Sequence, residues 1–152
     1  MERKSVLIVD DDPVHRRLMS GIVPQFIDAD VLTASCGRKA LDILTHQQLN
    51  VALVLLDIHM PDCDGVEVIM ELANRACPAG IVIVSASGAT LPAIDTLARA
   101  SGLNVLAASP KPVSLELMET MAAWVDQYGK DRRAQHDWPT MREHVPEFAM
   151  IS

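Results

Sequence analysis

Five short apolar runs recur along the chain, and each is followed by a stretch whose apolar residues repeat at helical spacing. The runs occupy residues 5–9, 31–34, 51–56, 81–84 and 103–108. Continuous apolar runs of this length are typical of strands that are buried on both faces of a sheet. Strands that alternate with helices through short links predict a parallel sheet with helices on both sides. The sequence therefore predicts an α/β fold with a doubly wound, five-stranded parallel sheet.

The first expected helix has its own start and stop signals. Three apolar residues repeat at helical spacing and so predict the helix: Leu18, Ile22 and Phe26. Pro13 suits the first turn of this helix, and Asp12 before it suits the capping position. Pro24 is expected to end the regular helix near Val23. The other four helices are expected around residues 40–44, 66–73, 91–98 and 115–125.

The length and composition indicate one globular domain. The chain has 152 residues, of which 49% are apolar and 22% charged, so it can bury a core. The pattern of strands and helices fades after Tyr128, so we expect a domain at residues 1–128 and a tail or linker stub at residues 129–152. No apolar stretch is long enough to span a bilayer, and the first residues lack the apolar region of a signal peptide. We therefore expect no membrane contact and a cytoplasmic location.

Net charge and cysteine content exclude two further classes of protein. The formal net charge is −7 and the chain has no basic stripe, which argues against direct binding of nucleic acid. The three cysteines, Cys36, Cys63 and Cys77, are odd in number and wrongly spaced for a disulfide framework or a zinc site. We expect them to be reduced and to pack as small apolar residues.

Polar side chains follow the ends of four of the expected strands. Asp10 and Asp11 come after the first run, Asp57 after the third, Ser85 after the fourth and Lys111 after the fifth. The carboxyl ends of parallel strands meet at one edge of a sheet, so these side chains should lie together. Close carboxylates repel each other by ~1 kcal/mol in water-like surroundings, and a hard divalent cation, Mg²⁺ or alternatively Mn²⁺, would relieve that repulsion. Asp57 is then expected to be a nucleophile toward phosphorus, with Ser85 and Lys111 on the phosphoryl oxygens.

Other polar residues near these positions have simpler explanations. Asp62 and Asp64 lie in a segment that is dense in turn residues, and we expect them to stabilise the turn rather than to bind metal. Asp12 is expected to be a helix cap rather than a ligand. His59 is expected to act mainly through its backbone carbonyl. The remaining histidines are expected at the surface: His15, His46, His136 and His144.

Four motifs, taken together and in this order, resemble the receiver domain of two-component response regulators. They are VDDDP at residues 9–13, LDIHMPDCDG at 56–65, VSA at 84–86 and KP at 111–112. The resemblance covers about residues 5–127. It implies a flavodoxin-like strand order of 2-1-3-4-5. It also implies that Asp57 accepts a phosphoryl group from the phosphohistidine of a sensor histidine kinase or a histidine phosphotransfer protein.

The same resemblance implies a role for the other site residues. Asp11 would ligate Mg²⁺ directly, Asp10 would do so largely through water, and the backbone carbonyl of His59 would add a further ligand. Lys111 would pair with the phosphate, and the peptide bond that follows it would be cis. Ser85 would be the hydroxyl that moves when the domain switches.

The sequence departs from the family at the switch. Members often have an aromatic residue at the position of Ala108, and often have Phe at the position of Val113. A bulky group such as Met118, or a shift of Leu91, could fill the space that the missing ring leaves. Residues 102–112 look more like receivers attached to cyclic-di-GMP phosphodiesterase effectors. These departures concern the output step rather than phosphorylation.

Switching is expected to act on one face of the domain. Phosphorylation adds roughly −1.5 to −2 charges, by analogy with other phosphorylated residues. Ser85 would then move toward Asp57, and the face formed by the fourth helix, the fifth strand and the fifth helix would repack. That face would bind an effector domain, a protein partner or a second copy of the chain in a homodimer.

Two alternatives remain open at this stage. A haloacid-dehalogenase-like phosphatase would use Asp10 and Asp12 as nucleophile and general acid, but it leaves Asp57 without a role and lacks the expected acidic pair downstream. A degenerate receiver that acts purely as a docking module would not need an intact set of five site residues.

Overall fold

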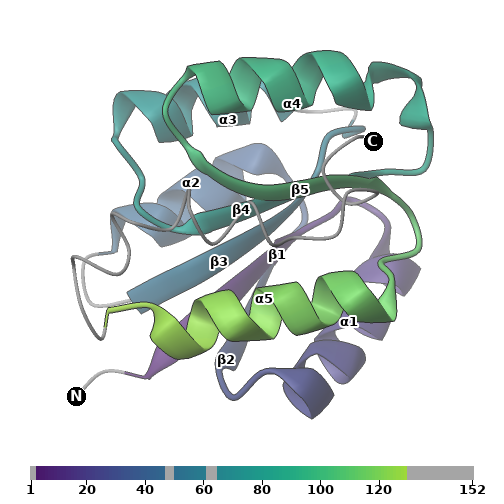
Figure 1. Cartoon of the computed structure of the whole chain (residues 1–152), viewed down its shortest axis with the longest axis vertical. Helices are drawn as coiled ribbons and strands as arrows, with labels where there is room; N and C mark the ends of the chain where they lie inside the picture. The colour runs from purple at the N-terminus through teal and green to yellow at the C-terminus, as the bar shows by residue number, and fades with distance from the viewer. Residues whose placement is uncertain (1–2, 47–49, 61–64, 130–152) are drawn as a thin grey trace.

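Five parallel strands form one sheet within the described part of the chain (Figure 1). The computed structural model of the chain describes residues 3–46, 50–60 and 65–129. The strands are β1 (Lys4–Val9), β2 (Asp30–Ala34), β3 (Asn50–Asp57), β4 (Gly80–Ser85) and β5 (Asn104–Pro110). They lie in the order β2-β1-β3-β4-β5, and every neighbouring pair is parallel. The expected fold class and strand order are confirmed.

Helices cover both faces of the sheet. They are α1 (Pro13–Phe26), α2 (Gly37–Thr45), α3 (Gly65–Asn74), α4 (Leu91–Ala100) and α5 (Leu115–Gln127), with the short 3₁₀ helix η1 (Gly88–Thr90) before α4. In Figure 1, α1 and α5 lie on one face of the sheet, and α2, α3 and α4 lie on the other. The chain is therefore doubly wound, as the alternation of strands and helices predicts. None of the helices in the described ranges is both long enough and apolar enough to cross a membrane.

The sheet separates two apolar cores. Successive residues of a strand point to opposite faces, so Ile8 packs in the core beneath α1 and α5, whereas Leu7 packs in the core beneath α2, α3 and α4. Trp124 of α5 anchors the first core, because its indole N–H donates a hydrogen bond of 2.6 Å to the carbonyl of Ala52 in β3. A Cβ atom at Gly80 would lie 2.6 Å from the indole nitrogen of Trp124, so only glycine fits there.

Of the three apolar residues whose spacing predicts α1, only Ile22 packs, in part, against the core. The exposed fractions of Leu18 and Phe26 are 54% and 42%, whereas Met19 and Val23 are buried. The apolar residues of α1 form two stripes that are one position apart. The stripe of Met19 and Val23, continued by Ile27, is the one that packs against the sheet.

The prediction that Pro24 ends this helix near Val23 is wrong. The helix continues through Pro24 to Phe26, and the N–H of Ile27 donates to the carbonyl of Val23. Pro24 stands in the last turn, where its missing N–H removes a single helical hydrogen bond. Burial of Val23 and Ile27 holds that turn in place.

Several predictions fall on residues outside the described ranges. These are the tail beyond Gly129, the turn residues Asp62 and Asp64, and Cys63. The other two cysteines, Cys36 and Cys77, are both free thiols, as expected.

Candidate functional site

Four strand ends meet at the carboxyl edge of the sheet and carry the predicted site residues. Asp10 follows β1, Asp57 and Ser85 are the last residues of β3 and β4, and Lys111 follows β5. Backbone hydrogen bonds fix these positions. The N–H of Asp10 donates to Ala34 at 3.1 Å, and the N–H of Lys111 donates to the carbonyl of Ser85 at 2.8 Å. Residues that are far apart in the sequence are therefore held in one place by the sheet itself.

Lys111 bridges the two buried carboxylates of this cluster. Its Nζ atom lies 2.9 Å from Oδ2 of Asp10 and 3.1 Å from Oδ2 of Asp57. Asp10 and Asp57 have exposed fractions of only 1% and 3%. A buried carboxylate needs a charged partner or several hydrogen bonds, and here one ammonium group serves both.

Three carboxylates form a set that could hold a metal ion. One oxygen from each of Asp10, Asp11 and Asp57 lies within 4.8 Å of the other two. Asp10 and Asp57 are buried, while Asp11 is exposed, so the set opens to solvent on one side. Hard oxygen donors with one open side suit Mg²⁺, which prefers one or two carboxylates and retains several waters. The residues present fit that ion.

The two buried carboxyl groups differ in their electrostatic surroundings. Burial raises the pKa of Asp57 above its ordinary value, and the nearby charge on Asp10 adds to this effect, although a backbone N–H and Lys111 oppose it. Burial acts in the same direction on Asp10, but a backbone N–H, Lys111 and His15 outweigh it and hold its pKa below the ordinary value. Burial would lower the pKa of Lys111, but its bonds to both carboxylates outweigh that effect and raise it.

Backbone groups near the cluster orient the carboxylate of Asp57 and the hydroxyl of Ser85. Oδ1 of Asp57 accepts a hydrogen bond of 3.0 Å from the N–H of His59, while the side chain of His59 is exposed. Ser85 is fully buried, and its Oγ accepts a hydrogen bond of 3.1 Å from the N–H of Ser87. Asp57 and Ser85 end neighbouring strands, so the hydroxyl lies on the strand next to the carboxylate.

His15 contacts the cluster, so its predicted position at the surface is wrong. Only 13% of its side chain is exposed, and its Nδ1 atom lies in contact with Oδ2 of Asp10. Arg16, the next residue, donates from Nη1 to the backbone carbonyl of Asp10 at 2.8 Å. The position of His15 and Arg16, in the first turn of the helix that follows β1, is the sequence signal for both contacts. The first turns of a helix that directly follows a strand lie above the carboxyl end of that strand.

Asp12 is a helix cap, as predicted. Its Oδ1 atom accepts a hydrogen bond of 3.0 Å from the N–H of Val14, in the first turn of α1. The carboxylate of Asp12 therefore caps α1 and is not part of the set formed by Asp10, Asp11 and Asp57. The phosphatase alternative requires Asp12 as a general acid, so this arrangement argues against it.

The predicted switch position, Ala108, is fully buried in the middle of β5. Its core contains Leu91, the first residue of α4, whereas Met118 packs in the core on the opposite face of the sheet. Of the two residues considered for the space beside Ala108, only Leu91 lies on the correct side. The peptide bond between Lys111 and Pro112 is cis, as expected.

Comparisons with known proteins point to one family. The family described as "Response regulator receiver domain" matches residues 6–123. The chain is 38% identical over 84 residues to the positive alginate biosynthesis regulatory protein of Pseudomonas aeruginosa, an alignment that covers 54% of this chain and 33% of that protein. It is 33% identical over 116 residues to a probable cyclic di-GMP phosphodiesterase of Vibrio cholerae, covering 76% of this chain and 25% of that protein.

The solved structures agree. The crystal structure of the response regulator protein TrrA from Thermotoga maritima, in complex with Mg(2+)-BeF, matches with a TM-score of 0.65 and 27% identity. That match covers 80% of this chain and 98% of the other. The chain spans about a third or less of the two curated relatives named above.

Proposed function

This chain belongs to the response regulator receiver domain family, and on that premise we propose that Asp57 is the residue that accepts the phosphoryl group. The domain is a phosphoacceptor signalling domain of a two-component system. Asp57 is buried at the end of β3, lies beside two other carboxylates, and is bridged to Asp10 by Lys111. The bridging lysine is the observation that carries the proposal. It is a cation held beside the acceptor oxygen and able to pair with a phosphate.

The transfer would exchange one bond to phosphorus for another. A carboxylate oxygen of Asp57 attacks phosphorus, the bond from phosphorus to the donor nitrogen breaks, and its electron pair stays with the donor imidazole. A bound Mg²⁺ would supply screening of negative charge, so that the anionic phosphoryl group can approach. Asp10, Asp11 and Asp57 would hold it, together with the backbone carbonyl of His59.

The remaining site residues would stabilise the charge that the phosphoryl group brings. Lys111 would shift from its two carboxylates toward the phosphoryl oxygens, and the Ser85 hydroxyl would contact another of them. In this view the domain promotes only its own phosphorylation and dephosphorylation. It would not turn over a separate substrate.

Movement of Ser85 is proposed to reach the partner-binding face through α4. The N–H of Ser87 donates to the Ser85 hydroxyl, so a shift of that hydroxyl pulls on the segment that leads into η1 and α4. Leu91 begins α4 and packs in the core that contains Ala108. The face made by α4, β5 and α5 would therefore change its affinity for an effector domain, a protein partner or a second copy of the chain.

The proposed partner on the input side is a sensor histidine kinase or a histidine phosphotransfer protein. A cytoplasmic location follows from this proposal, because the donor phosphohistidine is formed from ATP. On the output side, the similarity to a probable cyclic di-GMP phosphodiesterase supports an effector of that class.

The proposal is tested by incubation with acetyl phosphate and Mg²⁺, with and without EDTA, followed by intact-mass measurement. We expect the protein to gain one phosphoryl group only when the metal is present, and Asp57→Asn to gain none. The matched control is Asp12→Asn, which keeps the helix cap and should be phosphorylated normally. If Asp57→Asn still gains a phosphoryl group, Asp57 is not the nucleophile. A folded protein that gains nothing from this donor or from a phosphorylated kinase would favour the docking-module alternative.

A further inference from the structure

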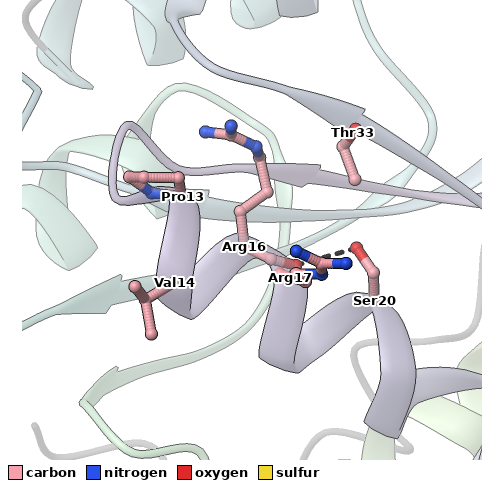
Figure 2. Close-up of a pocket in the computed structure, with 6 residues that line it drawn as sticks. All are labelled: Pro13, Val14, Arg16, Arg17, Ser20 and Thr33. Atoms are coloured by element: carbon pink, nitrogen blue, oxygen red, sulfur yellow. Dashed lines mark hydrogen bonds between the residues drawn. The ribbon is translucent and has the colours of Figure 1, made fainter.

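A pocket of about 500 Å³ lies beside the N-terminal half of α1, outside the carboxylate cluster (Figure 2). Its described lining residues come from α1 and from β2: Pro13, Val14, Arg16, Arg17, Ser20 and Thr33. Figure 2 shows the two arginines extending from neighbouring positions of α1, with Thr33 on the strand. The volume is within the ~300–1,000 Å³ range of pockets that bind small molecules.

The charge of this pocket is opposite to that of the whole chain. The formal net charge of the protein is −7, yet two arginines and no acidic residue are among the described residues that line the pocket. Within the described ranges, Arg17 has no hydrogen-bond or ion-pair partner for its guanidinium group. An arginine with no ion pair, beside a second arginine, offers a site for an anion.

Arg16 is held in place before any ligand arrives. Its Nη1 atom donates to the carbonyl of Asp10 at 2.8 Å, and its side chain is partly buried. That bond uses one of five N–H groups, so others remain for a ligand. Because the guanidinium is already ordered, binding an anion there costs less side-chain entropy than it would at a mobile arginine.

The two hydroxyl groups of the pocket differ in what they can offer. The Ser20 hydroxyl donates to the carbonyl of Arg16 at 2.8 Å, so its proton is used within the helix. Thr33 forms no side-chain hydrogen bond within the described part of the chain, so its hydroxyl is available as a donor. The available donors among the described lining residues are therefore two guanidinium groups and one hydroxyl.

We propose that this pocket binds a phosphomonoester. Guanidinium groups bind phosphate through paired hydrogen bonds, and two of them match the two charges of a monoester. The organic part of the ligand would lie against Pro13 and Val14, and Val14 is an apolar residue whose exposed fraction is 75%. The site is separate from the phosphoacceptor set, since Asp57, Ser85 and Lys111 are not among its lining residues. This inference does not depend on the proposed role of Asp57.

The test is a titration of the ¹⁵N-labelled protein by NMR, without metal and at constant ionic strength. The probes are inorganic phosphate and phenyl phosphate. We expect saturable shifts at the amides of Ser20 and Thr33 and at the Nε–H of both arginines. Phenyl phosphate should bind more tightly than inorganic phosphate, because its ring can contact Pro13 and Val14.

Three exposed-arginine variants complete the test. Arg17→Gln should weaken binding by about fivefold or more, and Arg17→Lys should weaken it less, because the charge remains while the paired hydrogen bonds are lost. The matched control is Arg75→Gln, which removes one charge just after the end of α3, where Arg75 forms an ion pair with Glu71. Arg75→Gln should bind phenyl phosphate with the same affinity as the unmodified protein.

Specific outcomes would overturn the proposal. Shifts that do not saturate, or a loss in Arg75→Gln equal to that in Arg17→Gln, would mean that only general charge attraction is present. Shifts centred on Ser87 and Lys111 would place the anion in the phosphoacceptor site instead. Equal affinity for the two probes would exclude the phosphomonoester class.

Discussion

The Nδ1 atom of His15 lies in contact with the Oδ2 atom of Asp10. This carboxylate oxygen also accepts the hydrogen bond from Lys111, while the other oxygen accepts one from the N–H of Asp12. Oδ1 of Asp10 therefore has one partner within the protein and Oδ2 has two. A carboxylate oxygen accepts about two hydrogen bonds, so Oδ2 can accept one from a metal-bound water only if His15 or Lys111 leaves it.

Replacement of His15 by leucine should strengthen Mg²⁺ binding. The bonds from Lys111 and Asp12 keep Asp10 oriented, so the main effect is the loss of a competitor for one oxygen. A net hydrogen bond of about 1 kcal/mol corresponds to about a fivefold change in affinity. Isothermal titration calorimetry with Mg²⁺ measures this change, and His46→Leu, at the end of α2, is the control that should leave the affinity unchanged. Weaker binding in His15→Leu would show that His15 orients Asp10 for the metal.

Asp57→Asn should stabilise the metal-free protein, by on the order of 1 kcal/mol. The pKa of Asp57 is raised by burial and by the charge of Asp10, so the folded state favours a neutral group at this position. Thermal unfolding in EDTA should show a higher Tm for Asp57→Asn than for the unmodified protein. The gain should shrink in Mg²⁺, because the ion relieves the same repulsion. The control Asp12→Asn, outside the cluster, should unfold at the original temperature; an equal rise in that variant would contradict the explanation.

The pH dependence of the two buried carboxyl groups should have opposite signs. Asp10 has a lowered pKa, so its contribution to stability is complete above the ordinary aspartate value of ~3.9 and is lost as the pH falls through its lower folded value. Asp57 has a raised pKa, so its ionisation destabilises the fold above that raised value and the penalty disappears as the pH falls through it.

Carboxyl ¹³C NMR of the metal-free protein distinguishes these groups. The midpoint of Asp57 should lie above the ordinary value and that of Asp10 below it. Mg²⁺ should move the Asp57 midpoint downward, because a bound cation favours the charged form. A midpoint for Asp57 at or below the ordinary value would mean that Lys111 dominates its surroundings.

Gly80→Ala should destabilise the domain by about 1–3 kcal/mol, the usual cost of overpacking a core. The new methyl group would lie 2.6 Å from the indole nitrogen of Trp124 and disturb the hydrogen bond of that nitrogen to Ala52. Gly21→Ala is the contrasting variant, since nothing lies within 4 Å of a Cβ atom at this position in α1. It should stabilise the domain by about 0.5–1 kcal/mol. Urea unfolding of both variants, with tryptophan fluorescence as one probe, measures the difference.

The sheet and its site were predictable because their sequence signals are local. Each buried strand is an apolar run, and the chemistry-bearing residues, Asp10, Asp57 and Ser85 among them, come directly at its end. Parallel pairing then brings those ends together without further information. The cis peptide bond after Lys111 and the capping role of Asp12 were also correctly predicted.

The burial pattern of α1 and the wrong prediction for His15 both depend on which side of the helix faces the sheet, and the sequence pattern does not contain this information. In α1, Leu18 and Phe26 share helical spacing with Ile22, while Met19 and Val23 form an equally regular stripe one position further on. Periodicity cannot choose between two such stripes, because the choice depends on which side of the helix meets the sheet. The contact of His15 with Asp10 has the same origin, since it depends on how the first turns of α1 are rotated above β1.

The sheet separates the helices α1 and α5 from the helices α2, α3 and α4. Ala108, at the proposed switch, faces only the second set. Ala108 and Leu91 share a core with α2 and α3, whereas Met118 and the rest of the inner face of α5 belong to the other core. A rearrangement that starts beside Ala108 can therefore pass to α4 within one core, whereas it reaches α5 through β5 or through the short link from β5 to α5. Within the face made by α4, β5 and α5, the effect of phosphorylation would therefore reach the α4 side first and the α5 side second.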